Sequence, residues 1–130
     1  MLTGKSVLVI DDEPGIRLLL SRALKAAGAT VYEAPDGQFG ALVLEQAKLD
    51  LVITDILMPG KDGVETICDI RLTWPHIKIV AISGGGRLDP AVFLKLAEDL
   101  GADLTMNKPL NIKALIEQVS ALFPTSAKVA

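Results

Sequence analysis

The chain has 130 residues, half of them hydrophobic, which is enough for the core of a single domain. Its net charge is −3, from 13 basic and 16 acidic residues, and no cluster of Lys and Arg marks a surface for direct nucleic-acid binding. The single cysteine excludes an intrachain disulfide. No apolar run approaches the roughly 18 residues of a membrane helix, and the N-terminus lacks the apolar core of a signal peptide. We therefore expect a soluble cytoplasmic protein without a membrane partner.

Short apolar runs alternate with helical patterns along the chain. The runs have the length and bounds of buried strands, and the segments between them carry apolar residues at helical spacing. Pro14 suits an early helical position, Asp36 and Asp62 suit helix N-caps, and Gly28 suits a helix end. We predict strands at 7–10, 31–34, 51–54, 79–82 and 104–107, and helices at 14–27, 37–47, 63–74, 90–100 and 112–122.

This alternation predicts an α/β fold, in which a parallel sheet is covered on both faces by helices. The runs 7–10, 51–54 and 79–82 are apolar on both faces, as central strands are, whereas 31–34 and 104–107 are mixed, as edge strands are. The distribution is consistent with a five-stranded sheet in the flavodoxin-like order 2-1-3-4-5, flanked by five helices. We expect one domain over residues 1–123 and a short C-terminal tail over 124–130.

Polar side chains follow four of the predicted strands. Asp11 and Asp12 come after the first, Asp55 after the third, Ser83 after the fourth and Lys108 after the fifth. Because the carboxyl ends of parallel strands lie at one edge of the sheet, we expect one pocket beside the switch in strand order. Each acid alone has a structural explanation, such as a helix cap, but the combination indicates a functional site. A divalent cation is a natural way to hold carboxylates together.

These elements resemble the receiver domain of bacterial two-component response regulators. The resemblance extends over essentially the whole chain, and it implies that Asp55 is the nucleophile that takes a phosphoryl group from a partner's phosphohistidine. The matching elements, in the family's order and spacing, are Asp11-Asp12, Asp55-Ile56-Leu57-Met58-Pro59-Gly60-Lys61-Asp62-Gly63, Ser83 and Lys108-Pro109.

The resemblance also implies a magnesium site. Asp12, Asp55 and the backbone carbonyl of Leu57 would hold Mg²⁺, and Asp11 would orient its ligands and water. The ion would offset the repulsion between these acids and the incoming phosphate, and it would stabilise charge in the transition state.

Lys108 and Ser83 complete the site that the resemblance implies. Lys108 would pair with a phosphoryl oxygen as a point charge, and the cis bond that the family has before Pro109 would aim it inward. Ser83 would donate its hydroxyl to the phosphoryl group. The implied partners are a histidine kinase or a histidine phosphotransfer protein upstream and another protein downstream. The receiver itself would be a monomer or a weak, phosphorylation-dependent dimer.

The sequence departs from the family at the switch that would transmit the signal. The family commonly has an aromatic residue in the last strand, where this chain has Thr105. A ring-based switch cannot operate with threonine. We therefore expect the loop after Ser83, which begins with Gly84 and Gly85, to reorder and carry the signal.

Two other functions remain open from the residues. A magnesium-dependent phosphatase with an aspartyl nucleophile, such as a haloacid dehalogenase, would use similar chemistry. Such enzymes have an Asp-x-Asp motif after the first strand, which Asp11 and Glu13 fit badly. They also have further acids after a later strand, and none follows Ser83 in the run Gly84-Gly85-Gly86. The other alternative is an interaction module that is not phosphorylated. Such a module would not need the acids, the Ser83 hydroxyl group and Lys108, so the presence of the complete set argues against it. We favour a signalling phosphoacceptor, which catalyses only its own phosphorylation and dephosphorylation.

Overall fold

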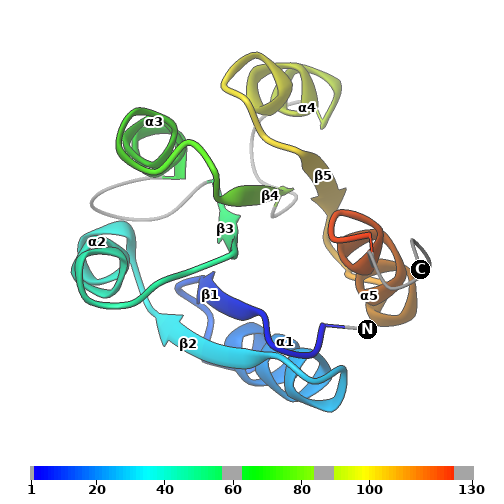
Figure 1. Ribbon diagram of the computed structural model, residues 1–130. Helices are drawn as coiled ribbons and strands as arrows, with labels where there is room; N and C mark the ends of the chain where they lie inside the picture. Colours follow the sequence, from blue (N-terminus) through cyan, green and yellow to red (C-terminus); the bar gives the residue numbers. More distant parts are fainter. Residues whose placement is uncertain (1, 57–62, 84–89, 125–130) are drawn as a thin grey trace.

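A computed structural model describes residues 2–56, 63–83 and 90–124 of the chain (Figure 1). The predicted tail, 124–130, lies outside these residues except for its first position. None of the described helices has the length and apolarity needed to span a membrane. The strands are β1 (Ser6–Ile10), β2 (Thr30–Ala34), β3 (Leu51–Asp55), β4 (Lys78–Ser83) and β5 (Leu104–Asn107). The helices are α1 (Pro14–Ala26), α2 (Gly37–Gln46), α3 (Gly63–Thr73), α4 (Pro90–Asp99) and α5 (Ile112–Ala121).

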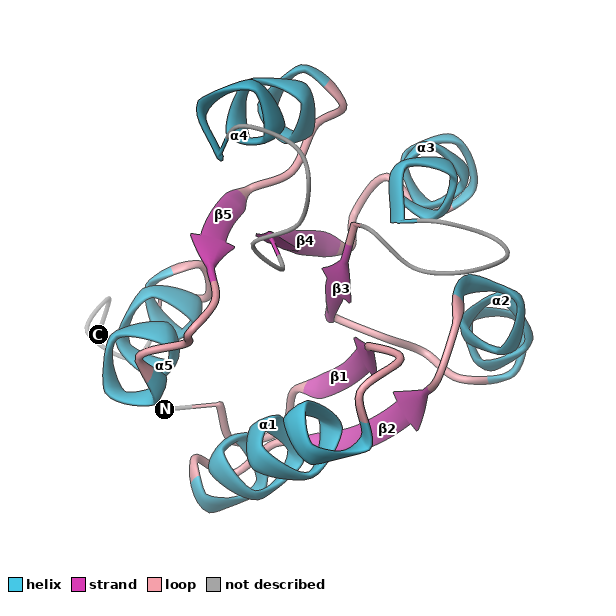
Figure 2. Cartoon of the chain, turned by 180° about the vertical axis from the view of Figure 1, so that it is seen from behind, coloured by secondary structure: helices cyan, strands magenta, loops and turns pink. Residues whose placement is uncertain are grey.

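The strands form one parallel sheet in the order β2-β1-β3-β4-β5. The predicted α/β class and strand order are confirmed, and each predicted element agrees with the structure to within one residue at either end. β1 lies between β2 and β3, so the strand order switches there, as predicted. Helices α1 and α5 cover one face of the sheet, and α2, α3 and α4 cover the other (Figure 2).

Each central strand contributes to both halves of the core. In β1, Val7 and Val9 pack with the cluster beneath α1 and α5, whereas Leu8 and Ile10 pack with the cluster beneath α2, α3 and α4. All four side chains are at most 1% exposed. Burial on both faces explains why the central runs carry apolar residues on both faces, while β2 and β5 include more exposed residues.

Side-chain and glycine signals set the ends of several elements. Asp36 accepts a backbone hydrogen bond at the start of α2, as predicted, and Gly28 takes a φ of +103° after α1, a conformation that favours glycine. Asn111 caps α5 in the same way as Asp36 caps α2, a cap that was not predicted from the sequence. The cap predicted at Asp62 lies outside the described residues.

Arg71 joins the end of α3 to two other parts of the fold. Its guanidinium group donates to the carbonyl oxygen of Gly101, at 2.6 and 2.9 Å, and to that of Ile77, at 2.9 Å. It also forms an ion pair with Asp103 at 2.6 Å. The planar fork of donors on arginine can reach all three partners at once, which an ammonium group cannot do. Arg71 thereby fixes α3 against the start of β4 and the turn between α4 and β5.

We expect Arg71→Met to lower the free energy of unfolding by about 2 kcal/mol, because several charge-assisted hydrogen bonds disappear together. Arg71→Lys should lower the free energy of unfolding by nearly as much, since lysine retains the positive charge but lacks the planar fork of donors. Urea denaturation measures both. Arg22→Met, at an exposed position of α1, is the matched control and should have little effect. An Arg71→Lys variant as stable as the control would contradict the assigned role.

Candidate functional site

Four carboxylates meet where β1 and β3 end. Asp11, Asp12 and Glu13 follow β1, and Asp55 is the last residue of β3. Each offers an oxygen atom, and these atoms lie within 4.8 Å of one another. Asp11 and Asp55 are only 1% and 3% exposed, whereas Asp12 and Glu13 are exposed. Two carboxylates are thus withdrawn from solvent at the switch in strand order, where open α/β sheets bind ligands.

The backbone of the loop after β1 holds Asp11 in place. The Asp11 N–H donates to the carbonyl oxygen of Ala34 at 3.1 Å, which extends the pairing of β1 with β2. Arg17 donates from Nη1 to the Asp11 carbonyl oxygen at 2.7 Å, and Asp11 Oδ1 accepts from the Glu13 N–H at 2.9 Å. Pro14 then begins α1. These contacts turn the chain sharply and leave the other carboxylate oxygen of Asp11 facing the cluster.

Lys108, directly after β5, reaches into this cluster. Its Nζ atom lies 2.8 Å from Glu13 Oε1, and 3.1 Å from both Asp11 Oδ2 and Asp55 Oδ2. The lysine side chain is 12% exposed. One ammonium group therefore contacts three of the four carboxylates, two of which are buried.

The pKa of Lys108 is raised above its ordinary value of 10.5. Burial disfavours the charged ammonium group, but the hydrogen bonds to Glu13 and Asp55 and the ion pair with Asp11 outweigh it and raise this pKa. A group whose pKa is raised on folding stabilises the folded state fully below its unfolded pKa, and this stabilisation is lost as the pH rises through the folded pKa. The charge of Lys108 therefore contributes to stability throughout the neutral range and is lost only in strong base.

Ser83 and Thr105 lie on neighbouring strands and face the same side of the sheet. Ser83, 4% exposed, ends β4, and Thr105 is partly exposed in β5. Leu104 and Met106 pack with the cluster beneath α1 and α5, so the alternation of side chains along a strand turns Thr105 to the face covered by α2, α3 and α4. Ser83 faces that side by the same argument, since Ile82 packs beneath α1 and α5.

Of the other site residues predicted from the sequence, the structure describes the Lys108–Pro109 pair but not the three loop positions. The Lys108–Pro109 peptide bond is cis, and the backbone N–H of Lys108 donates to the Ser83 carbonyl oxygen at 2.9 Å. Leu57, Gly84 and Gly85 lie outside the described residues.

Glu13 is the one member of the cluster that was not assigned to the site from the sequence. It occupies the N-cap position of α1, yet its side chain makes no cap hydrogen bond and instead contacts Lys108. The run of three acids, Asp11-Asp12-Glu13, is the signal that could have identified it, because three successive carboxylates exceed what one helix cap requires.

The cluster fits a hard divalent cation. Carboxylate oxygens are the ligands that Mg²⁺ takes from proteins, usually one or two of them together with water and phosphate oxygens. Among the described residues, four carboxylates face one ammonium group, so the cluster keeps a negative charge after Lys108 is counted. A cation would reduce the repulsion that remains.

Residues 7–120 match the family model of the response regulator receiver domain. Sporulation initiation phosphotransferase F of Bacillus subtilis is 26% identical over 121 residues, which cover 93% of this chain and 95% of that protein. The transcriptional regulatory protein CpxR of Klebsiella pneumoniae is 32% identical over 92% of this chain, but the chain spans only about half of CpxR (50%). The crystal structure of the response regulator TrrA of Thermotoga maritima, in complex with Mg²⁺-BeF, has a TM-score of 0.79 and 33% identity and covers 92% of this chain and 99% of TrrA.

Gly63, the first residue of α3, packs directly on the backbone at the end of β3. A Cβ atom at this position would overlap the Asp55 carbonyl oxygen and the Ile56 Cα atom. The Gly63 N–H also donates to the Ile56 carbonyl oxygen at 2.9 Å. Helix α3 therefore starts in contact with the backbone that carries Asp55, and only glycine leaves room for this.

We expect Gly63→Ala to lower the free energy of unfolding by about 3 kcal/mol, because backbone atoms cannot move aside as a flexible side chain can. Gly15→Ala is the control. A Cβ atom at Gly15 would meet nothing within 4 Å, so alanine should stabilise α1 by up to about 1 kcal/mol. Thermal unfolding of both variants compares them directly, and equal effects would contradict the close approach at Gly63.

We expect Lys108→Met to lower the free energy of unfolding by about 3 kcal/mol in the presence of EDTA, since the variant leaves the buried carboxylates of Asp11 and Asp55 without their cation. Adding Asp55→Asn to Lys108→Met should recover part of the loss, because one of the two buried negative charges that faced Lys108 is removed. Urea denaturation at neutral pH gives the four stabilities of this cycle. Further destabilisation of Lys108→Met by Asp55→Asn would overturn the charge argument.

Proposed function

Because the chain belongs to the response regulator receiver domain family, we propose that it accepts a phosphoryl group on Asp55 in a two-component or phosphorelay pathway. The observation that carries the proposal is the environment of this carboxylate. Asp55 is 3% exposed at the end of β3, its oxygens lie among those of three further acids, and Oδ2 is 3.1 Å from Lys108 Nζ. The ammonium group favours the ionised carboxylate, which is the form that acts as a nucleophile.

In the proposed reaction, a carboxylate oxygen of Asp55 attacks the phosphorus of a phosphohistidine on a histidine kinase or a histidine phosphotransfer protein. The new O–P bond forms as the N–P bond breaks, and the histidine nitrogen keeps the electron pair of the broken bond. The product is an acyl phosphate on Asp55. The chain is then a signalling phosphoacceptor and does not turn over a separate substrate.

Asp12, Asp55 and the backbone carbonyl of Leu57 would hold Mg²⁺, and Asp11 would orient ligands and water around it. Bound Mg²⁺ supplies positive charge that offsets the repulsion between the acids and the phosphate and stabilises the transition state. The carboxylate oxygens of the cluster support this assignment. TrrA, which is similar in structure, was crystallised in complex with Mg²⁺-BeF.

Lys108 and Ser83 would bind the transferred group. Lys108 contacts the carboxylate that would carry the phosphoryl group, so a phosphoryl oxygen on Asp55 would compete with the carboxylates for the same ammonium group. Ser83 ends the strand next to β3 and would donate its hydroxyl to a second phosphoryl oxygen.

The output of phosphorylation would be a change in protein–protein contacts. Reordering of the loop at Gly84 and Gly85 would follow the movement of Ser83, and Thr105 offers no ring to take part. The partners would be a kinase or phosphotransfer protein upstream and a protein target downstream, without direct nucleic-acid binding. We keep two further predictions. The chain would be a monomer or a weak phosphorylation-dependent dimer, and its location would be cytoplasmic.

We expect intact mass spectrometry to detect one phosphoryl adduct after incubation with acetyl phosphate and Mg²⁺. Omitting Mg²⁺ in the presence of EDTA should abolish the adduct, because the acids then repel the phosphate. Asp55→Asn should abolish it as well. Asp99→Asn, at an exposed position of α4, is the matched control and should be phosphorylated as the wild type is.

Two outcomes separate the alternatives to this proposal. Sustained turnover of a small phosphate ester would favour the magnesium-dependent phosphatase. The absence of any adduct in the wild type, with or without Mg²⁺, would favour an interaction module whose acid cluster is structural.

A further inference from the structure

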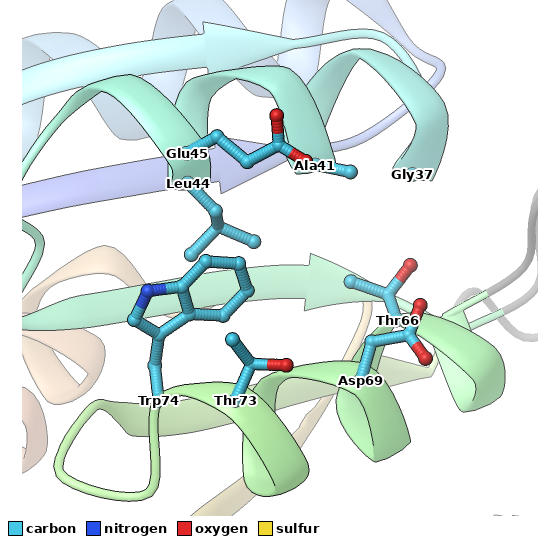
Figure 3. A pocket seen from close by; sticks show the side chains of 8 residues that line it. All are labelled: Gly37, Ala41, Leu44, Glu45, Thr66, Asp69, Thr73 and Trp74. Carbon is cyan, nitrogen blue, oxygen red and sulfur yellow. The ribbon is translucent and has the colours of Figure 1, made fainter.

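A hollow of about 210 Å³ lies between α2 and α3 (Figure 3). Leu44 and the indole ring of Trp74 form an apolar wall at one end. Glu45 from α2 and Asp69 from α3 lie on opposite sides of it, and the hydroxyl group of Thr73 lies between the indole and Asp69. None of the four acids of the candidate site lines this hollow. It is therefore a separate surface feature with an apolar end and an acidic rim.

The lining favours a positively charged occupant. Two carboxylates and no basic side chain are among the residues that line the hollow. Glu45 is exposed and makes no hydrogen bond or ion pair with another described residue, whereas Asp69 has a partner within the chain. The face of an indole ring attracts cations, and carboxylates form charge-assisted hydrogen bonds with them. A planar guanidinium group can stack on the ring and donate to a carboxylate at the same time, so arginine fits better than lysine.

A second hollow, of about 490 Å³, shares Trp74 with the first. Its apolar lining also includes Ala47, Leu49 and Ile77, and its polar lining is Lys48, Asp50 and His76. It lies where β3 and β4 begin, at the opposite end of the sheet from the acid cluster. The first hollow is smaller than the roughly 300–1,000 Å³ of most small-molecule sites. Two hollows that share one aromatic side chain instead suit two nearby side chains of one protein segment.

We propose that the hollow between α2 and α3 binds an arginine side chain of a partner protein. The guanidinium group would lie against the indole ring of Trp74 and between the carboxylates of Glu45 and Asp69. A nearby apolar side chain of the same segment would occupy the second hollow. This docking surface uses none of the residues of the phosphoacceptor site and does not require a phosphorylated Asp55.

Trp74 is the only tryptophan of the chain, so its fluorescence reports directly on the hollow. The probes are N-acetyl-arginine amide, its lysine analogue and its citrulline analogue, in which a neutral urea group replaces the guanidinium group. We expect saturable binding of the arginine probe with a dissociation constant on the order of 1 mM, as suits a single anchoring side chain. The citrulline and lysine probes should bind at least about fivefold more weakly. Chemical shifts in a ¹H–¹⁵N spectrum should change in α2 and α3.

Glu45→Gln should weaken binding of the arginine probe about threefold, as expected for the loss of one partly exposed charge pair. The matched control is Glu117→Gln on the exposed side of α5, which should bind as the wild type does. Asp55→Asn should also bind as the wild type does, so this test is independent of the phosphoacceptor proposal. Equal affinity for arginine and citrulline, shift changes outside α2 and α3, or an unaltered Glu45→Gln variant would each overturn the assignment.

Two further peptides test for a protein segment as the source of the arginine. Acetylated arginyl-alanyl-leucine amide and leucyl-alanyl-arginine amide place an apolar side chain on either side of the anchor. One of them should bind about fivefold more tightly than the arginine probe, because leucine buries apolar surface in the second hollow. If neither gains affinity, the site takes a small guanidinium compound and the proposed protein partner is wrong.

Discussion

The contact between the Lys108 ammonium group and the buried carboxylates of Asp11 and Asp55 is the interaction on which the site depends. Two carboxylates so close together and so little exposed repel each other, and neither has enough water around it to screen its charge. Lys108, at 3.1 Å from each, supplies the compensating charge. The same side chain joins the end of β5 to the ends of β1 and β3 across β4. The charge balance of the site and the position of the β5 end are therefore one feature, so chemistry that changes the charge on Asp55 also changes the force on β5.

Helix α3 is the second structural element that the site and the remaining surface share. Its first residue, Gly63, touches the backbone at Asp55, and Arg71 near its last turn binds the start of β4 and the turn before β5. Trp74 follows directly and forms the wall of both hollows. The helix is thus held at both ends by contacts that tolerate little displacement. It spans the sheet from the acid cluster to the opposite end, so the hollow beside α2 is built on the same helix that contacts β3 at Asp55.

Topology could be predicted from the sequence because its signal is local. Apolar runs bounded by turn residues predicted the strands, and their two-sided or mixed character separated central strands from edge strands, while the order itself was taken from the flavodoxin-like fold. Parallel strands bring Asp11, Asp55 and Lys108 to one edge whatever the details of packing. Side-chain partners could not be predicted in the same way. Glu13 and Lys108 are 95 positions apart, and their contact depends on the rotamers of two long side chains. The hydrogen bonds of Arg71 to Gly101 depend likewise on a turn whose position only the folded chain determines.

This chain has Thr105 where its family commonly has an aromatic residue. Thr105 lies on one of two routes by which a change at Asp55 can reach the surface. On the first route Ser83 and Thr105 share a face of the sheet, but the small side chain of Thr105 would leave little volume to be displaced by the proposed movement of Ser83. On the second route no side chain intervenes, since Gly63 rests on the carbonyl oxygen of Asp55 itself. A backbone displacement at Asp55 therefore has to move the first turn of α3 or break the close approach at Gly63. In this chain the close approach of Gly63 therefore constrains the backbone at Asp55 more directly than the side chain of Thr105 in β5 does.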